Sequence, residues 1–447
     1  MFQRKLIVVT CAVALLALSA GVSEASLSRV EGMGLGSVPF LSQFTDDYVN
    51  IYPYPVSVVR QNNLVLAELG HNPGGDVNPV QSETEQSLTI IKNFPSFGAI
   101  AFQMEQNDNN SAFPNNLTNQ NLDLIWGKGF DKLDLAVRFD YTNSSLEVSD
   151  NANNSAEAHG TDFLFNVLDP YPFGTTFAQD AIVGGNPILG GGPIELNTWG
   201  VTPSIALHMS NDNRIEAALT LRNYSLDRHV TTAGVQGETW EDGGNMSYAL
   251  FVRAIMNDGD RATWYPAGWY VNNDLSYTVS NLGGPENREV DETYKSWGIG
   301  LSHNMRVNDN NLLIFGAVVS EAKHEYDRND GNDGALDGQI KSFEDKTMVL
   351  PIFFASLETE ATSWLKIRMG ATQALENTES NETDFDATSL KIKEHTSSFD
   401  FNLGAGIRWN NLDFDLTLNE AFPMSGGWIL SGDEATPATR ASATYHF

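Results

Sequence analysis

The sequence predicts an all-β fold, a transmembrane antiparallel up-and-down β-barrel of about 16 strands, with about 14 as the alternative count. Three observations lead to this fold class. The chain begins with a short export signal, it has no later apolar run as long as a membrane-spanning helix, and apolar and polar residues alternate through successive hairpins. Because only helices and closed barrels satisfy their backbone groups inside a bilayer, a strand-rich membrane protein is expected to close into a barrel.

The N-terminus, residues 1–25, has the form of a secretory signal peptide. Arg4 and Lys5 precede an apolar run from Leu6 to Leu18, and small residues lead to Ala25. The alternative is an uncleaved membrane anchor, but about 13 apolar residues are fewer than the roughly 20 that span a bilayer. We therefore expect cleavage after Ala25 and export of the mature chain.

The composition argues against several classes of function. The one cysteine, Cys11, lies in the signal peptide, so we expect no disulfide and no thiol chemistry in the mature chain. The sequence has 57 acidic and 26 basic residues, a formal net charge of −31. Nucleic acid is not an expected partner, because its binding depends on Lys and Arg at phosphates. The eight histidines show no metal-ligand spacing and no motif assigns a catalytic residue, so no enzyme activity is predicted.

The strands are predicted from alternation between the two faces of the chain. Large apolar side chains occupy every second position from Leu133 to Tyr141, and Asp134, Arg138 and Asp140 lie between them. This pattern is typical of a strand with lipid outside and water inside. Polar turns rich in Asn, Asp and Gly separate such strands, as at residues 129–132, 210–213, 257–260, 308–310, 360–363 and 410–411.

The last strand, Thr439 to Phe447, alternates in the same way and ends on an aromatic residue. In this it resembles the bacterial outer-membrane β-barrels, including the porins. The resemblance implies a place in the cell outer membrane, contact with its lipid, and insertion by the barrel assembly machinery. Residues 57–447 are predicted to form the barrel, with short turns and both termini in the periplasm and long loops outside the cell. The sequence does not decide between a monomer and a homo-oligomer.

The segment before the first strand, residues 26–56, contains glycines that no phosphate-loop pattern explains. Gly32, Met33 and Gly34 are followed by Asp46 and Asp47, and then by an Asn-Ile-Tyr-Pro stretch. This order resembles the N-terminal region of the long-chain fatty-acid transporter family, although the family's Asn-Pro-Ala-Gly motif is absent. The resemblance implies a plug inside the lumen built around these five residues. The alternative is a loosely ordered periplasmic leader.

The longest predicted loop, residues 148–196, is polar at first and then apolar and glycine-rich. Loops of this length are uncommon unless they have a function. As the third extracellular loop it is expected to fold inward and narrow a pore. A cap that binds a partner and a disordered loop are the alternatives.

Charged residues are predicted on the inward faces of several strands, where they would line the lumen. Rings of charge set selectivity in wide pores, but a polar lumen also pairs its charges merely to be stable. Both interpretations apply to the candidate constriction residues Arg138, Arg222, Arg253, Arg368, Arg408, Asp134, Asp140 and Glu216.

One acidic loop has oxygen ligands that suit calcium, but it lacks the EF-hand spacing. A solvated acidic loop is therefore preferred over a calcium site, and no cofactor is expected. The residues concerned are Asp327, Asn329, Asp330 and Asp333.

Together these observations predict a porin that lets small solutes diffuse passively and prefers cations, because acidic loops attract them to its mouth. Two alternatives remain. One is a plugged transporter of hydrophobic substrates, and the other is a platform that does not transport and binds a partner through its loops.

Overall fold

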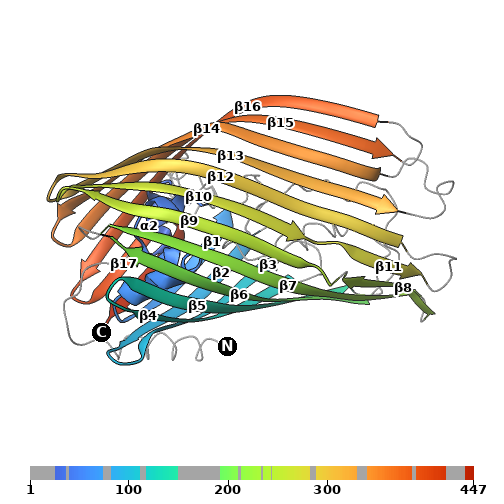
Figure 1. Ribbon diagram of the computed structural model, residues 1–447, viewed down its shortest axis with the longest axis horizontal. Helices are drawn as coiled ribbons and strands as arrows, with labels where there is room; N and C mark the ends of the chain where they lie inside the picture. Colours follow the sequence, from blue (N-terminus) through green and yellow to red (C-terminus); the bar gives the residue numbers. More distant parts are fainter. Residues whose placement is uncertain are drawn as a thin grey trace, which may run out of the picture.

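In the computed structural model the chain forms one closed sheet around a short helical segment (Figure 1). The structure describes residues 26–36, 40–73, 82–110, 117–148, 192–209, 213–232, 235–242, 244–281, 288–329, 340–384, 389–418 and 438–447. The predicted signal peptide and most of the predicted long loop lie outside these ranges. No helix among the described residues has the length and apolar character to cross a membrane.

The strands follow one another in chain order. Their bounds are β1 (Leu64–Pro73), β2 (Ser82–Phe94), β3 (Gly98–Asn110), β4 (Leu117–Gly129), β5 (Leu133–Val148), β6 (Gly192–His208), β7 (Arg214–Thr232), β8 (Val235–Asp242), β9 (Met246–Asp258), β10 (Ala262–Asp274), β11 (Tyr277–Asn281), β12 (Arg288–Asn308), β13 (Asn311–Asn329), β14 (Ile340–Thr362), β15 (Leu365–Asp384), β16 (Ser389–Trp409), β17 (Leu412–Leu418) and β18 (Ala438–His446).

Two barrel strands are interrupted, so 18 segments make 16 strands. β8 and β9 both pair with β7, and β10 and β11 both pair with β12. The first and last strands close the barrel antiparallel, with Leu64 opposite His446 and Gly70 opposite Arg440. The predicted all-β, up-and-down barrel is confirmed, as is the count of 16 strands rather than 14.

The two ends of the barrel differ. Short turns join the strands at the left end in Figure 1, where the C-terminus also lies. These turns use residues that tolerate a left-handed backbone, such as Gly259 at φ +70° and Asn410 at φ 55°. At the other end β12 to β16 run long, with 23 residues in β14. Since about 9–11 residues cross a bilayer as a strand, these strands project well beyond it.

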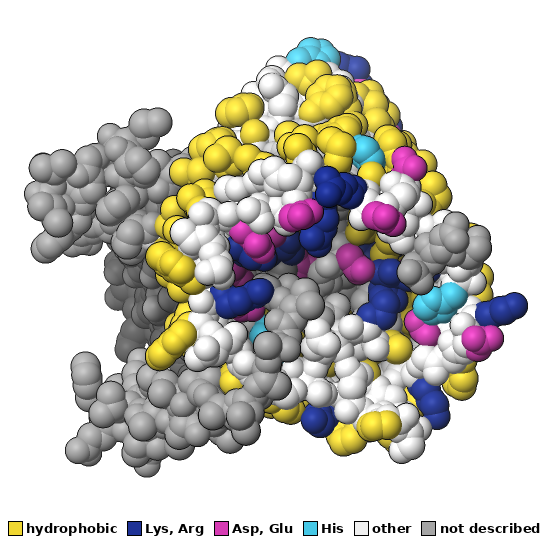
Figure 2. Space-filling model, turned by 90° about the vertical axis from the view of Figure 1, so that its left-hand side faces the viewer, with side chains coloured by type: hydrophobic (Ala, Val, Ile, Leu, Met, Phe, Trp, Pro, Cys, Tyr) yellow, Lys and Arg dark blue, Asp and Glu magenta, His cyan; other side chains and the backbone are white. Residues whose placement is uncertain are grey.

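The two faces of the wall have opposite character, as the alternation predicts. Large apolar side chains point outward and are exposed, among them Trp199 at 57% and Trp409 at 69%. Inward polar side chains are buried, such as Thr202 and Arg222. Figure 2 views the short-turn end and shows hydrophobic side chains around the outside and charged ones around a central hollow. The apolar exterior is the surface that lipid covers.

The lumen holds residues 26–36 and 40–60, called here the inner segment (Figure 1). It forms α2 (Leu27–Gly32) and three short 3-10 helices, η1 (Leu41–Phe44), η2 (Tyr48–Ile51) and η3 (Pro55–Arg60). β1 begins only at Leu64, so the boundary predicted at residue 57 falls inside η3. The predicted loop 148–196 is also too long, since β6 already begins at Gly192 and pairs with β5 there.

Candidate functional site

The inner segment is the candidate functional site, and its glycines place it against the wall. A Cβ atom on Gly32 would lie 2.9 Å from the Cα of Gly404 in β16. A Cβ on Gly370 in β15 would lie 1.8 Å from the carbonyl oxygen of Met33. Gly34 has φ +71°, a conformation that a residue with a side chain rarely adopts. The backbone at the end of α2 lies directly against the backbones of β15 and β16. The Gly-Met-Gly sequence allows this close approach, because its glycines have no side chain.

A network of charges at the start of the inner segment fixes α2 to β14, β15 and β17. Arg29 donates to Glu358 at 2.7 Å and to Asp47 at 2.9 Å. Arg368 donates to the same Glu358 at 2.7 Å and to Asp415 at 2.6 Å. Glu358 thus joins one arginine of the segment to one of the wall. Removing one partner of a buried ion pair costs about 3–5 kcal/mol, because the other charge is left without compensation.

A second network surrounds Glu216 in β7, which is fully buried. Its carboxylate accepts from Arg214 at 2.8 Å, from Arg253 at 2.7 Å and from Arg60 of the inner segment. Asp46 of the segment accepts from Arg214 at 2.5 Å. Two arginines of the wall and one of the segment therefore share one wall carboxylate and one segment carboxylate.

Arg253 also binds the backbone of the inner segment. Its guanidinium donates to the carbonyl oxygens of Gln43 at 3.1 Å and Thr45 at 3.0 Å. It donates to the hydroxyl of Ser57 at 3.2 Å and lies 4.5 Å from the ring centre of Tyr54. The carbonyl of Thr45 also accepts from the side-chain amide of Asn50 at 2.8 Å, so the arginine adds a charged donor to backbone groups of the segment.

The other candidate constriction residues are also paired. Arg138 donates to Asp123 at 2.6 Å and to the carbonyl of Tyr52 at 3.3 Å. Arg222 lies 2.8 Å from Asp140. Asp134 bonds His208 at 2.7 Å. Of the five arginines only Arg408 is substantially exposed, at 34% of its side chain, and it bonds Asp413 at 2.9 Å near the short-turn end.

Sequence reasoning put these side chains on the lumen side and left two interpretations open, rings of charge that set selectivity and charges paired for stability. Four of the arginines are buried and paired in the structure. Arg138, Arg222, Arg253 and Arg368 are at most 1% exposed. Their physical role is to neutralise wall carboxylates, and three of them also reach the inner segment or its partners.

Asp46 and Asp47 differ in setting although they are adjacent. Asp47 caps the start of η2, where its carboxylate accepts the Tyr48 backbone N–H at 2.8 Å. Asp46 is 39% exposed as a side chain. Burial raises the pKa of the Asp46 carboxyl, but the guanidiniums of Arg214, Arg60 and Arg253 outweigh it and hold the pKa below its ordinary value.

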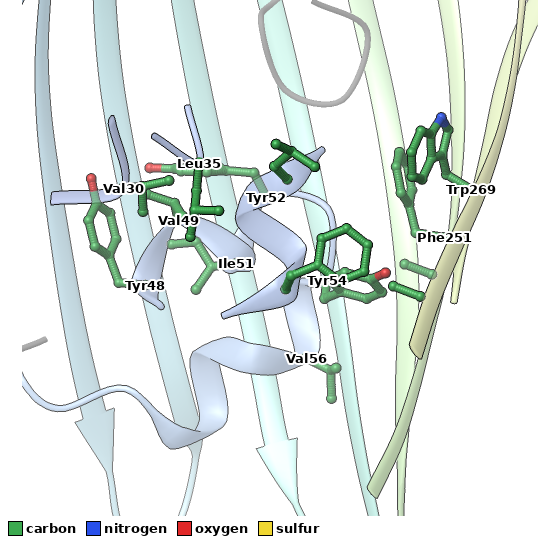
Figure 3. Close-up of a cluster of buried hydrophobic side chains, with 14 of the residues drawn as sticks. Val30, Leu35, Tyr48, Val49, Ile51, Tyr52, Tyr54, Val56, Phe251 and Trp269 are labelled. Atoms are coloured by element: carbon green, nitrogen blue, oxygen red, sulfur yellow. The ribbon is translucent and has the colours of Figure 1, made fainter. Parts of the chain in front are cut away.

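Aromatic rings complete the contact between the segment and the wall. Phe40 lies 5.5 Å from Phe251 and 5.0 Å from Trp269, and Phe44 lies 5.4 Å from Phe354. Figure 3 shows Tyr54 beside the strands that carry Phe251 and Trp269. Apolar side chains of the segment are buried with these rings: Val30, Met33, Leu35, Leu41, Tyr48, Val49, Ile51, Tyr52, Val56 and Val58.

Several members of the networks were not predicted from the sequence, among them Arg29, Glu358 and Arg214. Arg214 could have been found from alternation, since it lies two residues before the inward Glu216. The partner of Arg29 could not, because the contact joins positions 329 residues apart.

Within the described ranges no three metal-binding side chains gather at one point. Of the calcium candidates, Asp330 and Asp333 fall outside the described residues, while Asp327 and Asn329 end β13.

No known family model matches the sequence, and no curated protein matches it. Solved structures do show a likeness. A Pseudomonas aeruginosa FadL homologue has 11% identity and a TM-score of 0.42, over 96% of this chain and 99% of that one. The CymD monoaromatic hydrocarbon channel has 8% identity and a TM-score of 0.40, over 94% and 97%. The ferric-catecholate import receptor Fiu of E. coli K12 has 10% identity and a TM-score of 0.34, over 87% and 82%.

Proposed function

We propose that this protein is an outer-membrane transporter of small hydrophobic molecules, whose lumen is closed by the inner segment until that segment moves. The observation that carries the proposal is the apolar and aromatic contact between the segment and the wall. Phe251, Trp269 and Phe354 turn large rings inward, where a water-filled pore would favour polar groups. Displacing the segment would expose these rings as a path for an apolar solute.

The paired arginines support this proposal over passive diffusion of cations. A selective aqueous pore needs charges that face water. Arg138, Arg253 and Arg368 instead bond wall carboxylates and contact the inner segment or its partners. These pairs favour the plugged transporter over the passive porin that the composition and the acidic loops predicted.

Influx of naphthalene into cells that express the protein tests the proposal. The mature chain has no cysteine, so a disulfide can be introduced at one defined place. The backbone nitrogen of Val56 lies 2.8 Å from Oγ of Ser204 in β6, so Val56→Cys with Ser204→Cys would tether the segment to the wall.

We expect faster influx with the protein than without it, slow influx when the tether is oxidised, and recovery on reduction. The single variant Val56→Cys under the same oxidant is the matched control. Influx that is equal with and without the protein would overturn the proposal. So would influx that the oxidised tether leaves unchanged.

A further inference from the structure

The wall above the inner segment carries a second group of buried polar side chains, toward the end with the long strands. The outward residues of β12 mark its level. Trp297 and the apolar residues after it face lipid, whereas Asp291, Thr293 and Lys295 are polar. Inward residues 292–296 of β12 therefore lie beyond the lipid-covered belt, on the extracellular side.

Four polar atoms at this level are buried and have no hydrogen-bond partner among the described residues. They are Oε2 of Glu292, Oδ1 of Asn273, Oγ of Ser296 and Oδ1 of Asp345. Glu292 is 0% exposed, Asn273 2% and Ser296 6%. A buried polar atom without a partner costs about 1–3 kcal/mol, and more when it is charged, so such atoms call for a ligand that donates to them.

These side chains lie on the inward faces of neighbouring strands, and this surface is here called the acceptor cradle. His324 of β13 bonds the other oxygen of Glu292 at 3.0 Å and pairs across the sheet with Asp345 of β14. Asn273 of β10 pairs with Tyr294 of β12, which itself pairs with His324. Directly opposed residues have Cβ atoms about 4.5–5.5 Å apart, so the cradle spans four neighbouring strands.

The chemistry of the cradle selects a cation. It offers two carboxylates and an amide oxygen. The side chains opposite Glu292, Asn273 and Asp345 are those of Tyr326, Tyr294 and His324, none of which carries an ammonium or guanidinium group. Rings lie beside it, since Phe343 meets His324 edge-on at 4.8 Å. The described residues nowhere gather three side chains as a metal ion requires. An organic ammonium, which needs acceptors and apolar contact together, fits better than a bare metal ion.

We propose that the acceptor cradle binds the protonated amine of an apolar molecule at the extracellular mouth. The inference rests on the proposed function, since it names the class of substrate that the transporter takes first. The formal net charge of −31 favours the same choice, because an acidic protein attracts cations to its surface. Binding gives the unpaired oxygen of Glu292 an N–H donor that no described residue supplies.

Equilibrium binding of 2-phenylethylamine to the refolded mature chain at pH 7 tests this. The neutral 2-phenylethanol and calcium chloride are the comparison ligands. We expect the amine to bind at least about tenfold more tightly than the alcohol, and Glu292→Gln to remove that difference. Glu325→Gln is the matched control, because Glu325 lies one residue from His324 on the opposite face and pairs with Lys295 and Lys323.

Equal affinity for the amine and the alcohol would overturn the proposal, as would an equal loss in Glu325→Gln. Calcium that binds more tightly than the amine and depends on Glu292 would show a metal site instead. If Glu292→Gln fails to fold, judged by its heat-modifiable migration, Asp345→Asn takes its place, with a loss of at least about threefold expected. Naphthalene carries no amine, so its influx tests the proposed function separately from the cradle.

Discussion

Buried carboxylates are paired differently in the lower lumen, around the inner segment, and in the acceptor cradle above it. In the lower lumen Glu216 accepts from three arginines, and one of them, Arg60, comes from the inner segment. In the cradle one carboxylate oxygen of Glu292 bonds His324, and the other has no partner among the described residues. The inner segment supplies a partner at the lower site, whereas no described residue supplies one for the second oxygen at the upper site. We interpret the first as a closure and the second as a place for a ligand.

Among the substitutions considered, Glu216→Gln should weaken the docking of the inner segment most. It leaves Arg214, Arg253 and Arg60 without their shared carboxylate, and losing one partner of a buried pair costs about 3–5 kcal/mol. We expect the inner segment to detach, which protease cleavage within residues 26–60 would report. Arg408→Gln is the control, because Arg408 lies at the rim and does not touch the segment. Equal protection of the wild type and Glu216→Gln would refute the role given to this network.

Gly370→Ala should have the second largest effect on the docking of the inner segment. The new methyl group would lie 1.8 Å from the carbonyl oxygen of Met33, so the segment or the strand has to shift. Overpacking of this kind typically costs about 1–3 kcal/mol. We expect faster proteolysis of the segment with an unchanged barrel melting temperature. Gly259→Ala is the control. Gly259 lies in a turn where a Cβ meets nothing within 4 Å, so this substitution shows the effect of backbone strain without contact with the segment. Slow proteolysis of Gly370→Ala would mean that α2 does not press on β15.

Phe40→Ala should have a smaller effect, since it removes two ring contacts, with Phe251 and Trp269, and leaves the ion pairs intact. Each such contact contributes about 0.5–1.5 kcal/mol. We expect more naphthalene influx, because the closure is weakened on the aromatic side. Phe130→Ala, in an exposed turn outside the lumen, is the comparison. Lower influx than in the wild type would instead make Phe40 part of the path.

Acidification should have the smallest effect, because Asp46 is partly exposed. Burial raises the pKa of Asp46, and Arg214, Arg60 and Arg253 lower it further than burial raises it. A carboxyl with a lowered pKa stabilises the docked segment above about pH 4 and loses that contribution as the pH falls through its docked pKa. Proteolysis with an acid-active protease should therefore accelerate below about pH 4. Asp46→Asn should abolish this dependence, and an unchanged profile in that variant would assign it to other carboxyls.

The fold was largely predictable from the sequence, because alternation is a local signal. The strand from Leu133 to Tyr141, the turn at Asn410 and the closing strand at Phe447 all follow from neighbouring residues. The inward side of Arg138 and Glu216 followed from the same rule. The packing of Arg29 against Glu358 did not, because it depends on which parts of the barrel the segment meets. The pairing of charges in three dimensions therefore decides between an open lumen and a closed one.

The central claim is that the inner segment closes the lumen, and single-channel conductance of the refolded mature chain in a planar bilayer tests it most directly. Wild type should be silent in symmetrical salt, and Glu216→Gln should open stable channels under the same conditions. Large, steady, cation-preferring openings in the wild type would contradict the closure and restore the passive porin.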